Sequence, residues 1–207
     1  MSQILITGCG RSGTEYISHV AQKLGLDLPH ERVGADGIVD WAFAGNSDQA
    51  SKRHKIDFED FDVVLHQVRD PMRVMCSVST FSKQSWHVIF ANSPVQENKH
   101  PIVRAAEYWY YWNLQAQRIA HWTYRIESLE QVFSVFCAKL GLKPNRDILK
   151  TVPTDVNSRS KPGDRLHNRY QMFSWDDLFV CAPQLAGNVM ALAVSYGYEY
   201  DVLRAED

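Results

Sequence analysis

Apolar residues in this chain occur either in short continuous runs or at helical spacing. Strand-like runs begin at residue 4 and cover 63–68 and 122–126. The first run is followed by residues at helical spacing and by a glycine suited to end a helix: Tyr16, Ile17, Val20, Ala21, Leu24 and Gly25. Strands that alternate with helices build a parallel sheet covered on both faces, so the pattern predicts an α/β fold with three layers, α/β/α, around a central, mostly parallel sheet.

Two helices are expected between the second and third strands. Asp70 is placed to cap the first and Pro71 to open it, and this helix would run over about 72–81. Residues 84–100 are expected to form a loop, because Asn, Ser and Pro interrupt the segment. The second helix, over 102–120, is rich in Trp and Tyr. We interpret these rings mainly as packing, with one or two available to line a pocket.

The last part of the chain is predicted to be helical with one polar interruption. A helix is expected after Ser128, which is placed to cap it. Residues 151–168 are polar and basic and show no periodicity. Ser174, with an acid three residues later at Asp177, resembles a capping box. It would start one long helix that reaches about residue 195.

The composition predicts a single domain over residues 1–207. The chain is 45% hydrophobic with a net charge of −2, so it can bury a full core and is not expected to bind nucleic acid through charge. It has no run of about 18 apolar residues that would span a membrane, and a strand that begins at residue 4 leaves no room for a signal peptide. We therefore expect a cytoplasmic protein. Its cysteines and histidines are dispersed without metal-ligand spacing.

A glycine-rich loop, Gly8-Cys9-Gly10-Arg11-Ser12-Gly13-Thr14, joins the first strand to its helix. Such a loop aims backbone N–H groups and a helix N-terminus at one point, where a phosphate or sulfate group binds. A nucleotide kinase loop has lysine and then serine or threonine after its last glycine, whereas Thr14 and Glu15 follow Gly13 here. The loop cation is Arg11 instead, which predicts an anion that binds without a metal. An ordinary turn between strand and helix is the alternative.

A second anion-binding segment is predicted at the end of the second strand. Arg69 ends that strand, and Ser77 lies eight residues later on the following helix, on the same face as Arg73. A guanidinium and a hydroxyl can hold a phosphate from two sides. The alternative is a salt-bridged helix start in which Arg69 or Arg73 pairs with Asp70. Because parallel strands share one carboxyl edge, we expect the two segments to lie side by side.

Together the two segments resemble those of the P-loop sulfotransferases, in style closest to bacterial and tyrosylprotein-type members. The resemblance rests on Gly-x-x-Arg-Ser-Gly-Thr after the first strand, and on Arg-Asp-Pro with a serine eight residues after the arginine. In that family the first motif binds the 5′-phosphosulfate of PAPS (3′-phosphoadenosine 5′-phosphosulfate), and the second binds its 3′-phosphate. The cofactor-binding residues that the resemblance implies are Gly10, Arg11, Ser12, Gly13, Thr14, Glu15, Arg69, Ser77, Arg159 and Lys161.

Less specific similarities extend the resemblance over about residues 3–200. Glu127-Ser128-Leu129 is similar to the family's third-strand motif, although Ile126 stands where the family has a tyrosine that contacts adenine. The basic segment 159–164 resembles a late loop that closes over the 3′-phosphate. A solvated basic loop is the alternative for that segment.

The resemblance also implies a reaction, the transfer of a sulfuryl group from PAPS to a hydroxyl, or as a second choice to an amine. PAP (adenosine 3′,5′-bisphosphate) is released, and no metal is expected. Glu31 resembles in position the catalytic glutamate of tyrosylprotein and some bacterial members, His30 is the second candidate base, and Arg11 would neutralise the leaving phosphate. Alternatively, residues 30–32 form a solvated turn with a local ion pair.

The acceptor and two other functions stay open. The acceptor is a small molecule, a carbohydrate, a lipid or a peptide, because acceptor contacts lie in loops without a transferable pattern. A P-loop kinase that uses ATP and Mg²⁺ is disfavoured by the missing lysine and hydroxyl residue after Gly13. A non-catalytic protein that binds PAP or another nucleotide would keep the anion site without the chemistry.

Overall fold

A computed structural model describes residues 3–153 and 169–200 of the 207-residue chain. Its centre is a four-stranded sheet in the order β2-β1-β3-β4, and each neighbouring pair is parallel. The strands are β1 (Gln3–Gly8), β2 (Gly37–Val39), β3 (Phe61–Val68) and β4 (Trp122–Arg125). Ile4 of β1 pairs with Gly37 on one side and with Val63 on the other. The two inner strands, β1 and β3, are the ones that lead into the predicted anion-binding segments.

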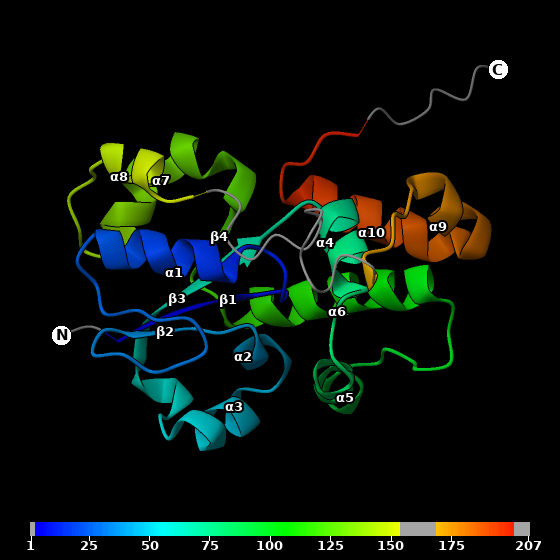
Figure 1. The fold of residues 1–207 in the computed structure, drawn as a ribbon, viewed down its shortest axis with the longest axis horizontal. Coiled ribbons are helices and arrows are strands. Elements are labelled where there is room, and N and C mark those ends of the chain that lie inside the picture. Colours follow the sequence, from blue (N-terminus) through cyan, green and yellow to red (C-terminus); the bar gives the residue numbers. More distant parts are fainter. Residues whose placement is uncertain (1–2, 154–168, 201–207) are drawn as a thin grey trace.

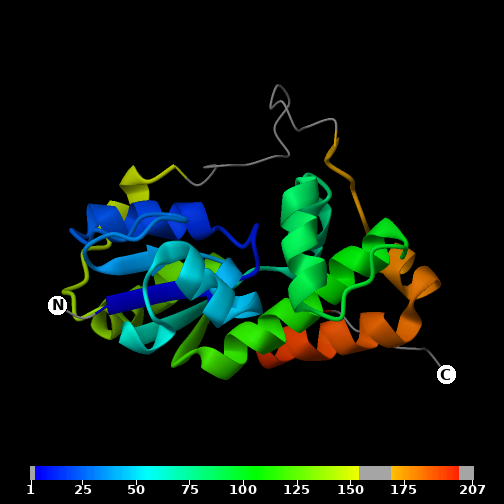
Figure 2. The ribbon, with the colours of Figure 1, turned by 90° about the horizontal axis from the view of Figure 1, so that it is seen from below.

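Helices cover both faces of the sheet (Figure 1), which confirms the predicted three-layer α/β fold. One face carries α1 (Thr14–Lys23), α7 (Leu129–Lys139) and α8 (Asp147–Thr151). The other carries α2 (Ala42–Gly45), α3 (Ser47–His54) and α6 (Pro101–Ile119), and α10 (Pro183–Ser195) packs on α6. Figure 2 shows α1 on one side of the strands, and α6 with α10 on the other. Short 3₁₀ turns, η1 (Phe58–Asp60) and η2 (Ile126–Ser128), precede β3 and α7.

The period-two pattern of β1 divides the core between these layers. Ile4 and Ile6 pack with α1 and α7, whereas Leu5 faces the opposite side and packs with Phe43 of α2. On α6, the rings with no measurable exposure are Tyr108, Trp109 and Trp112. Their burial confirms that the aromatic run serves mainly as packing.

Helix α4 (Pro71–Val78) begins directly after β3, as predicted. The Asp70 carboxylate accepts a hydrogen bond from the Arg73 N–H at 2.8 Å and so caps the helix. The helix ends at Val78 rather than near residue 81. Ser128 is likewise the N-cap residue of α7, but its side chain makes no capping hydrogen bond.

Two of the predicted boundaries are wrong. Residues 84–100 are not all loop, because α5 (Lys83–Asn92) follows Ser82, whose hydroxyl oxygen accepts from the Ser85 N–H at 3.1 Å. The last helix is divided into α9 (Trp175–Cys181) and α10. Pro183 causes the division, since its ring clashes with the preceding turn and it lacks an N–H. The predicted capping box at the start of α9 is present.

Strand β2 was not predicted at all. Residues 34–37, which lead into it, contain two glycines, at positions 34 and 37, and are typical of a flexible turn. Gly37 instead begins a strand, with φ of 127°, beside Ile4 of β1, and its N–H and carbonyl bond to the backbone of Gly34. A Cβ at this position would lie 2.0 Å from the Ile4 carbonyl oxygen, so the approach of the two strands requires glycine.

Candidate functional site

A cleft of about 900 Å³ opens where β1 and β3 end and where α1 and α4 begin. This is the edge at which parallel sheets bind their ligands. The predicted site residues that line the cleft are Gly10, Arg11, Ser12, Gly13, Thr14, Glu15, His30, Glu31, Arg69 and Ser77. The structure therefore brings the two segments predicted to bind anions and both candidate bases to one cleft. Arg159 and Lys161 lie outside the described residues.

Hydrogen bonds from the surrounding fold hold the glycine-rich loop in shape. The N–H and the hydroxyl of Ser12 both donate to the Cys9 carbonyl, at 3.1 and 2.6 Å. The Gly10 N–H donates to the Tyr108 hydroxyl at 2.7 Å, and the Gln67 side-chain amide donates to the Ser12 carbonyl at 2.7 Å. The Ser12 side chain is thus engaged within the loop. The first turn of α1, whose N–H groups have no acceptor within the helix, borders the cleft.

Arg11 connects the loop to the second segment. Its backbone is left-handed, with φ of 72°. Its guanidinium donates to the Thr80 hydroxyl at 3.1 Å and lies over the Phe81 ring, 5.1 Å from the ring centroid. The Arg11 carbonyl accepts a hydrogen bond from Nη1 of Arg69 at 3.0 Å. The two arginines therefore lie at the ends of neighbouring strands, and a hydrogen bond joins their segments.

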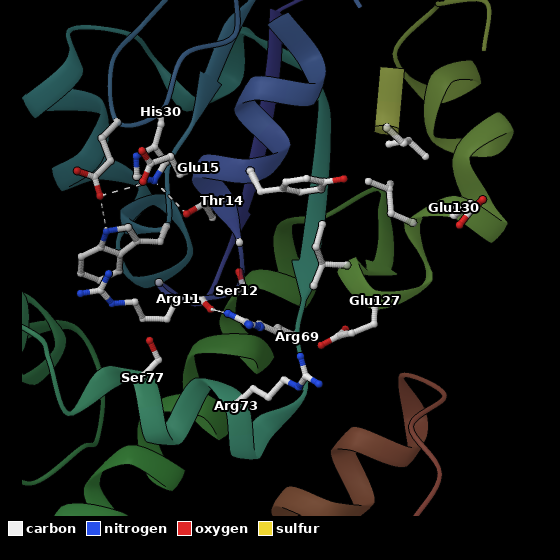
Figure 3. A pocket seen from close by; sticks show the side chains of 18 of the residues that line it. Arg11, Ser12, Thr14, Glu15, His30, Arg69, Arg73, Ser77, Glu127 and Glu130 are labelled. Carbon is white, nitrogen blue, oxygen red and sulfur yellow. Dashed lines mark hydrogen bonds and ion pairs between the residues drawn. The ribbon is translucent and has the colours of Figure 1, made fainter. Parts of the chain in front are cut away.

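Arg69, Arg73 and Ser77 form a basic wall of the cleft that also contains the Glu127 carboxylate (Figure 3). Burial lowers the pKa of the Arg69 guanidinium and the nearby Glu127 raises it, but arginine keeps its charge in proteins. Among the ion pairs of the described residues, none joins Arg69 or Arg73 to Asp70. The alternative of a salt-bridged helix start therefore does not describe this segment.

Glu127 holds the end of β3, where Arg69 lies, through two hydrogen bonds. One carboxylate oxygen, Oε1, accepts from the Asp70 N–H at 3.0 Å, and the other, Oε2, accepts from the Tyr198 hydroxyl at 2.8 Å. These bonds join the start of α7 to the start of α4 and to the chain after α10. Glu127 also brings a negative charge close to Arg69.

The two candidate bases lie at another part of the cleft, on the chain between α1 and β2. Nε2 of His30 is 3.0 Å from the Thr14 hydroxyl oxygen, and Oε1 of Glu31 accepts from the Trp41 indole N–H at 2.9 Å. Nε2 of His30 and Oε1 of Glu31 are 4.0 Å apart. The backbone of Glu31 has a left-handed conformation, with φ of 54°. Both side chains line the cleft, with His30 half-buried and Glu31 exposed. Their contact is also the one expected from the alternative, a solvated turn with a local ion pair.

Helix α6 supports three parts of this site through the polar atoms of its buried rings. The Tyr108 hydroxyl accepts from the Gly10 N–H, and the Trp109 indole donates to the Arg69 carbonyl at 3.1 Å. The Trp112 indole donates to the Trp41 carbonyl at 2.9 Å. The aromatic run therefore fixes the loop, the end of β3 and the residue that holds Glu31. The sequence predicts packing for most of these rings, and a pocket lining for one or two, but not this support through their polar atoms.

Several cleft residues were not predicted as part of the site. Tyr16, Leu129 and Leu149 line one end together with Ile126 and pack with it in one apolar cluster, and the charged side chains of Glu130 and Lys150 also line the cleft. The helical spacing assigns Tyr16 to the buried face of α1, yet it borders the cleft, and its place directly after the loop is the signal that could have identified it. Trp41, Phe81, Arg146 and Lys150 reach the cleft only through the tertiary fold.

Cys9 is a buried residue of the glycine-rich loop, and burial raises the pKa of its thiol, which disfavours a reactive thiolate. Within residues 3–153 and 169–200, no three His, Cys, Asp or Glu side chains are grouped as metal ligands. No helix in the same ranges combines the length and the apolar character needed to cross a membrane.

Known proteins share the fold but not a recognisable sequence. No family model matches the chain, and no curated protein does so either. Solved structures with this fold include the sulfotransferase domain from the curacin biosynthetic pathway, at 14% identity and a TM-score of 0.53 over 96% of this chain and 98% of that one. They also include the mouse sulfotransferase SULT7A1 complexed with PAP, at 12% identity and a TM-score of 0.50 over 97% of this chain and 86% of that one. The chain therefore has the fold of the sulfotransferases, as its motifs predict.

Proposed function

We propose that this protein is a PAPS-dependent sulfotransferase that transfers a sulfuryl group to an acceptor hydroxyl and releases PAP. One observation carries the proposal: the glycine-rich loop and the Arg69–Ser77 segment line a single cleft and are joined by the hydrogen bond from Arg69 to the Arg11 carbonyl. A ligand with anionic groups at both ends of a nucleoside matches this pair of sites. The shared fold, one example of which was solved with PAP, supports the same function.

The residues of the cleft fit such a ligand. The loop offers the α1 N-terminus and Arg11 to the 5′ end, and Arg69, Arg73 and Ser77 offer cationic and hydroxyl groups to a 3′-phosphate. The apolar end formed by Tyr16, Ile126, Leu129 and Leu149 suits an adenine ring. A Cβ on Gly10 would lie 2.9 Å from the tip of the Phe81 ring, so a side chain there would displace this ring.

PAPS supplies the sulfuryl group and a phosphate leaving group. In the proposed reaction the acceptor oxygen forms a bond to sulfur while the bond between sulfur and the 5′-phosphate oxygen breaks. Glu31, which Trp41 holds in place, takes the acceptor proton. Arg11 and the N–H groups of the first α1 turn stabilise the charge that develops on the leaving phosphate. Electrostatic stabilisation of this kind requires no magnesium ligand from the protein.

Calorimetric titration with PAP, AMP and ATP–Mg²⁺ tests the nucleotide assignment. We expect PAP to bind at micromolar concentration or tighter without metal, and at least tenfold tighter than AMP, because only PAP reaches Arg69 and Ser77. Arg69→Gln should bring PAP affinity close to that of AMP and weaken AMP binding much less, through the lost bond to the Arg11 carbonyl alone. Arg118→Gln, which removes an exposed arginine outside the cleft, is the charge-matched control. Binding of ATP–Mg²⁺ without PAP would move the protein to the kinase class.

Glu31→Gln tests the catalytic assignment. Turnover of PAPS with a panel of phenol, alcohol and sugar acceptors should fall by about 10²–10⁴-fold, the range typical of a lost general base, while PAP affinity changes little. If the wild-type protein binds PAP tightly yet transfers sulfate to none of these acceptors, a non-catalytic binder is the better description. If Glu31→Gln retains full turnover, another group is the base.

A further inference from the structure

Either Thr14 or His30 can be the donor of the hydrogen bond between their side chains, and a bound anion would decide which of them donates. The Thr14 hydroxyl oxygen lies 3.0 Å from Nε2 of His30. Thr14 is the first residue of α1 and is almost fully buried, with its side chain at the cleft. A threonine hydroxyl has one proton, and a neutral imidazole nitrogen either donates or accepts. The pair therefore has two arrangements, which present opposite groups to the cleft.

In the first arrangement the Thr14 O–H donates to Nε2. The hydroxyl then has only lone pairs left for the cleft, and these repel an anion. In the second arrangement Nε2–H donates to the Thr14 oxygen, and the O–H is left to donate to the anion. A hydrogen bond from a hydroxyl to an anionic oxygen is about twice as strong as one between neutral groups, so an anion at the loop selects the second arrangement.

We propose that His30 is a positioning residue that donates from Nε2 to Thr14 and thereby directs the threonine hydroxyl to the anion, and that Glu31, rather than Nε2 of His30, is the base. This inference rests on the proposed function, in which the 5′ end of the nucleotide occupies the loop. A nitrogen that already carries a proton and shares it with Thr14 accepts none from the acceptor. Glu31 fits the remaining role, because its ionised carboxylate is an acceptor only and lies 4.0 Å from Nε2.

PAP binding tests the proposal without a known acceptor. His30→Gln keeps an N–H donor at about the position of Nε2, whereas His30→Leu removes it. We expect His30→Gln to bind PAP within about threefold of wild type, and His30→Leu to bind about tenfold more weakly, as expected for one lost hydrogen bond to a charged group. Thr14→Val should weaken PAP binding to a similar degree. The double variant Thr14→Val/His30→Leu should be no weaker than Thr14→Val alone, because His30 acts through the threonine.

A purely structural role for His30 would give a different set of results. Thermal unfolding of each variant shows whether it is folded, and ¹⁵N spectra of the imidazole follow the tautomer directly. We expect the addition of PAP to wild type to leave Nε2 of His30 protonated. An Nε2 that stays unprotonated with PAP bound overturns the proposal, as does wild-type PAP affinity in His30→Leu. Additive losses in the double variant overturn it too.

Measurements of PAPS turnover and of pyrophosphate binding distinguish a failure of this proposal from a failure of the proposed function. If His30 were the base, His30→Gln would lose turnover as severely as His30→Leu while both retained PAP affinity, which contradicts the proposal but not the sulfotransferase assignment. Inorganic pyrophosphate serves as a ligand for the loop alone. If wild type binds pyrophosphate but not PAP, and His30→Leu weakens pyrophosphate, the proposed function fails and the role of His30 stands. If wild type binds neither, both fail.

Discussion

Arg11 and Glu31 share an uncommon backbone conformation. Among the described residues, the non-glycine residues with positive φ are Arg11, Glu31 and Lys55. A left-handed conformation costs an ordinary residue about 1–2 kcal/mol, so it persists where the surrounding structure fixes it, as often happens at functional sites. Arg11 is fixed by Thr80 and Arg69, and Glu31 by Trp41. The two residues proposed to act on the leaving phosphate and on the acceptor are thus both held in strained positions.

Substitutions of Glu31 measure this strain. Glu31→Gly and Glu31→Ala remove the same carboxylate and the same hydrogen bond to Trp41, but glycine adopts positive φ without cost. We expect Glu31→Gly to be more stable than Glu31→Ala by about 1 kcal/mol in urea unfolding. The matched pair at the exposed neighbour Arg32, whose φ is not positive, should show the opposite order, since glycine is ordinarily the less stable residue. An alanine variant as stable as the glycine variant would contradict strain at residue 31.

Helix α6 is the element on which the site depends. Its buried rings bond to the loop, to the end of β3 and to Trp41, so the spacing of Tyr108, Trp109 and Trp112 along one helix sets the relative positions of three segments. Rings of this kind combine large buried area with a single polar atom. The helix therefore acts as a rigid support that aligns the loop with the end of β3 and with Trp41, which holds Glu31.

Tyr108→Phe removes one of these supports and little else. The substitution keeps the ring but leaves the buried Gly10 N–H without its acceptor, which costs about 1–3 kcal/mol. We expect the free energy of unfolding to fall by that amount, and PAP affinity to fall as the loop loosens. Tyr111→Phe, at a half-buried position of the same helix, should change stability by less than about 0.5 kcal/mol. Equal effects of the two variants would argue against a special role for the Tyr108 hydroxyl.

Local signals explain which elements the sequence predicts. The loop, α1 and the Asp70–Pro71 helix start are set by residues within a few positions of each other, and all three are found in the structure. The break at Pro183 and the cap at Ser82 also had local signals, which the prediction passed over. Strand β2 had none, because Gly37–Val39 is a strand only through its pairing with β1.

The candidate site was likewise predictable only where local sequence signals or a general rule for the fold apply. The rule for parallel sheets brings the loop and the Arg69 segment to one edge, and the structure has them there. The rings of Trp41 and Phe81, the apolar end at Leu149 and the contact between Thr14 and His30 depend on how distant segments fold together. No spacing along the chain encodes these contacts, so only the structure supplies them.

A buried polar network joins the layers of the whole molecule around His66. Nε2 of His66 lies 3.0 Å from the Asn113 side-chain oxygen, and Nδ1 lies 3.2 Å from the Thr123 hydroxyl. The Asn113 amide nitrogen donates to the Trp109 carbonyl, which leaves its oxygen to accept from His66. The imidazole is therefore protonated at Nε2 and accepts from Thr123 at Nδ1. The ring has no measurable exposure and lies edge-on to Tyr196 of the chain after α10, so it links the sheet, α6 and the C-terminal region.

This network makes the stability of the molecule depend on pH. Burial lowers the pKa of His66 to about 4, although Asn113 opposes the shift, whereas an unfolded histidine titrates near 6.5. Between these values the unfolded chain binds a proton that the native state does not, so the free energy of unfolding falls as the pH falls, by up to about 1.4 kcal/mol per pH unit.

From pH 7 to pH 5, the free energy of unfolding of wild type should fall by about 2 kcal/mol more than that of His66→Gln, whose amide can still donate to Asn113. Urea unfolding at both pH values measures the difference, with His87→Gln at an exposed histidine as control. Parallel losses in wild type and His66→Gln would show that His66 gains its proton without opening the fold.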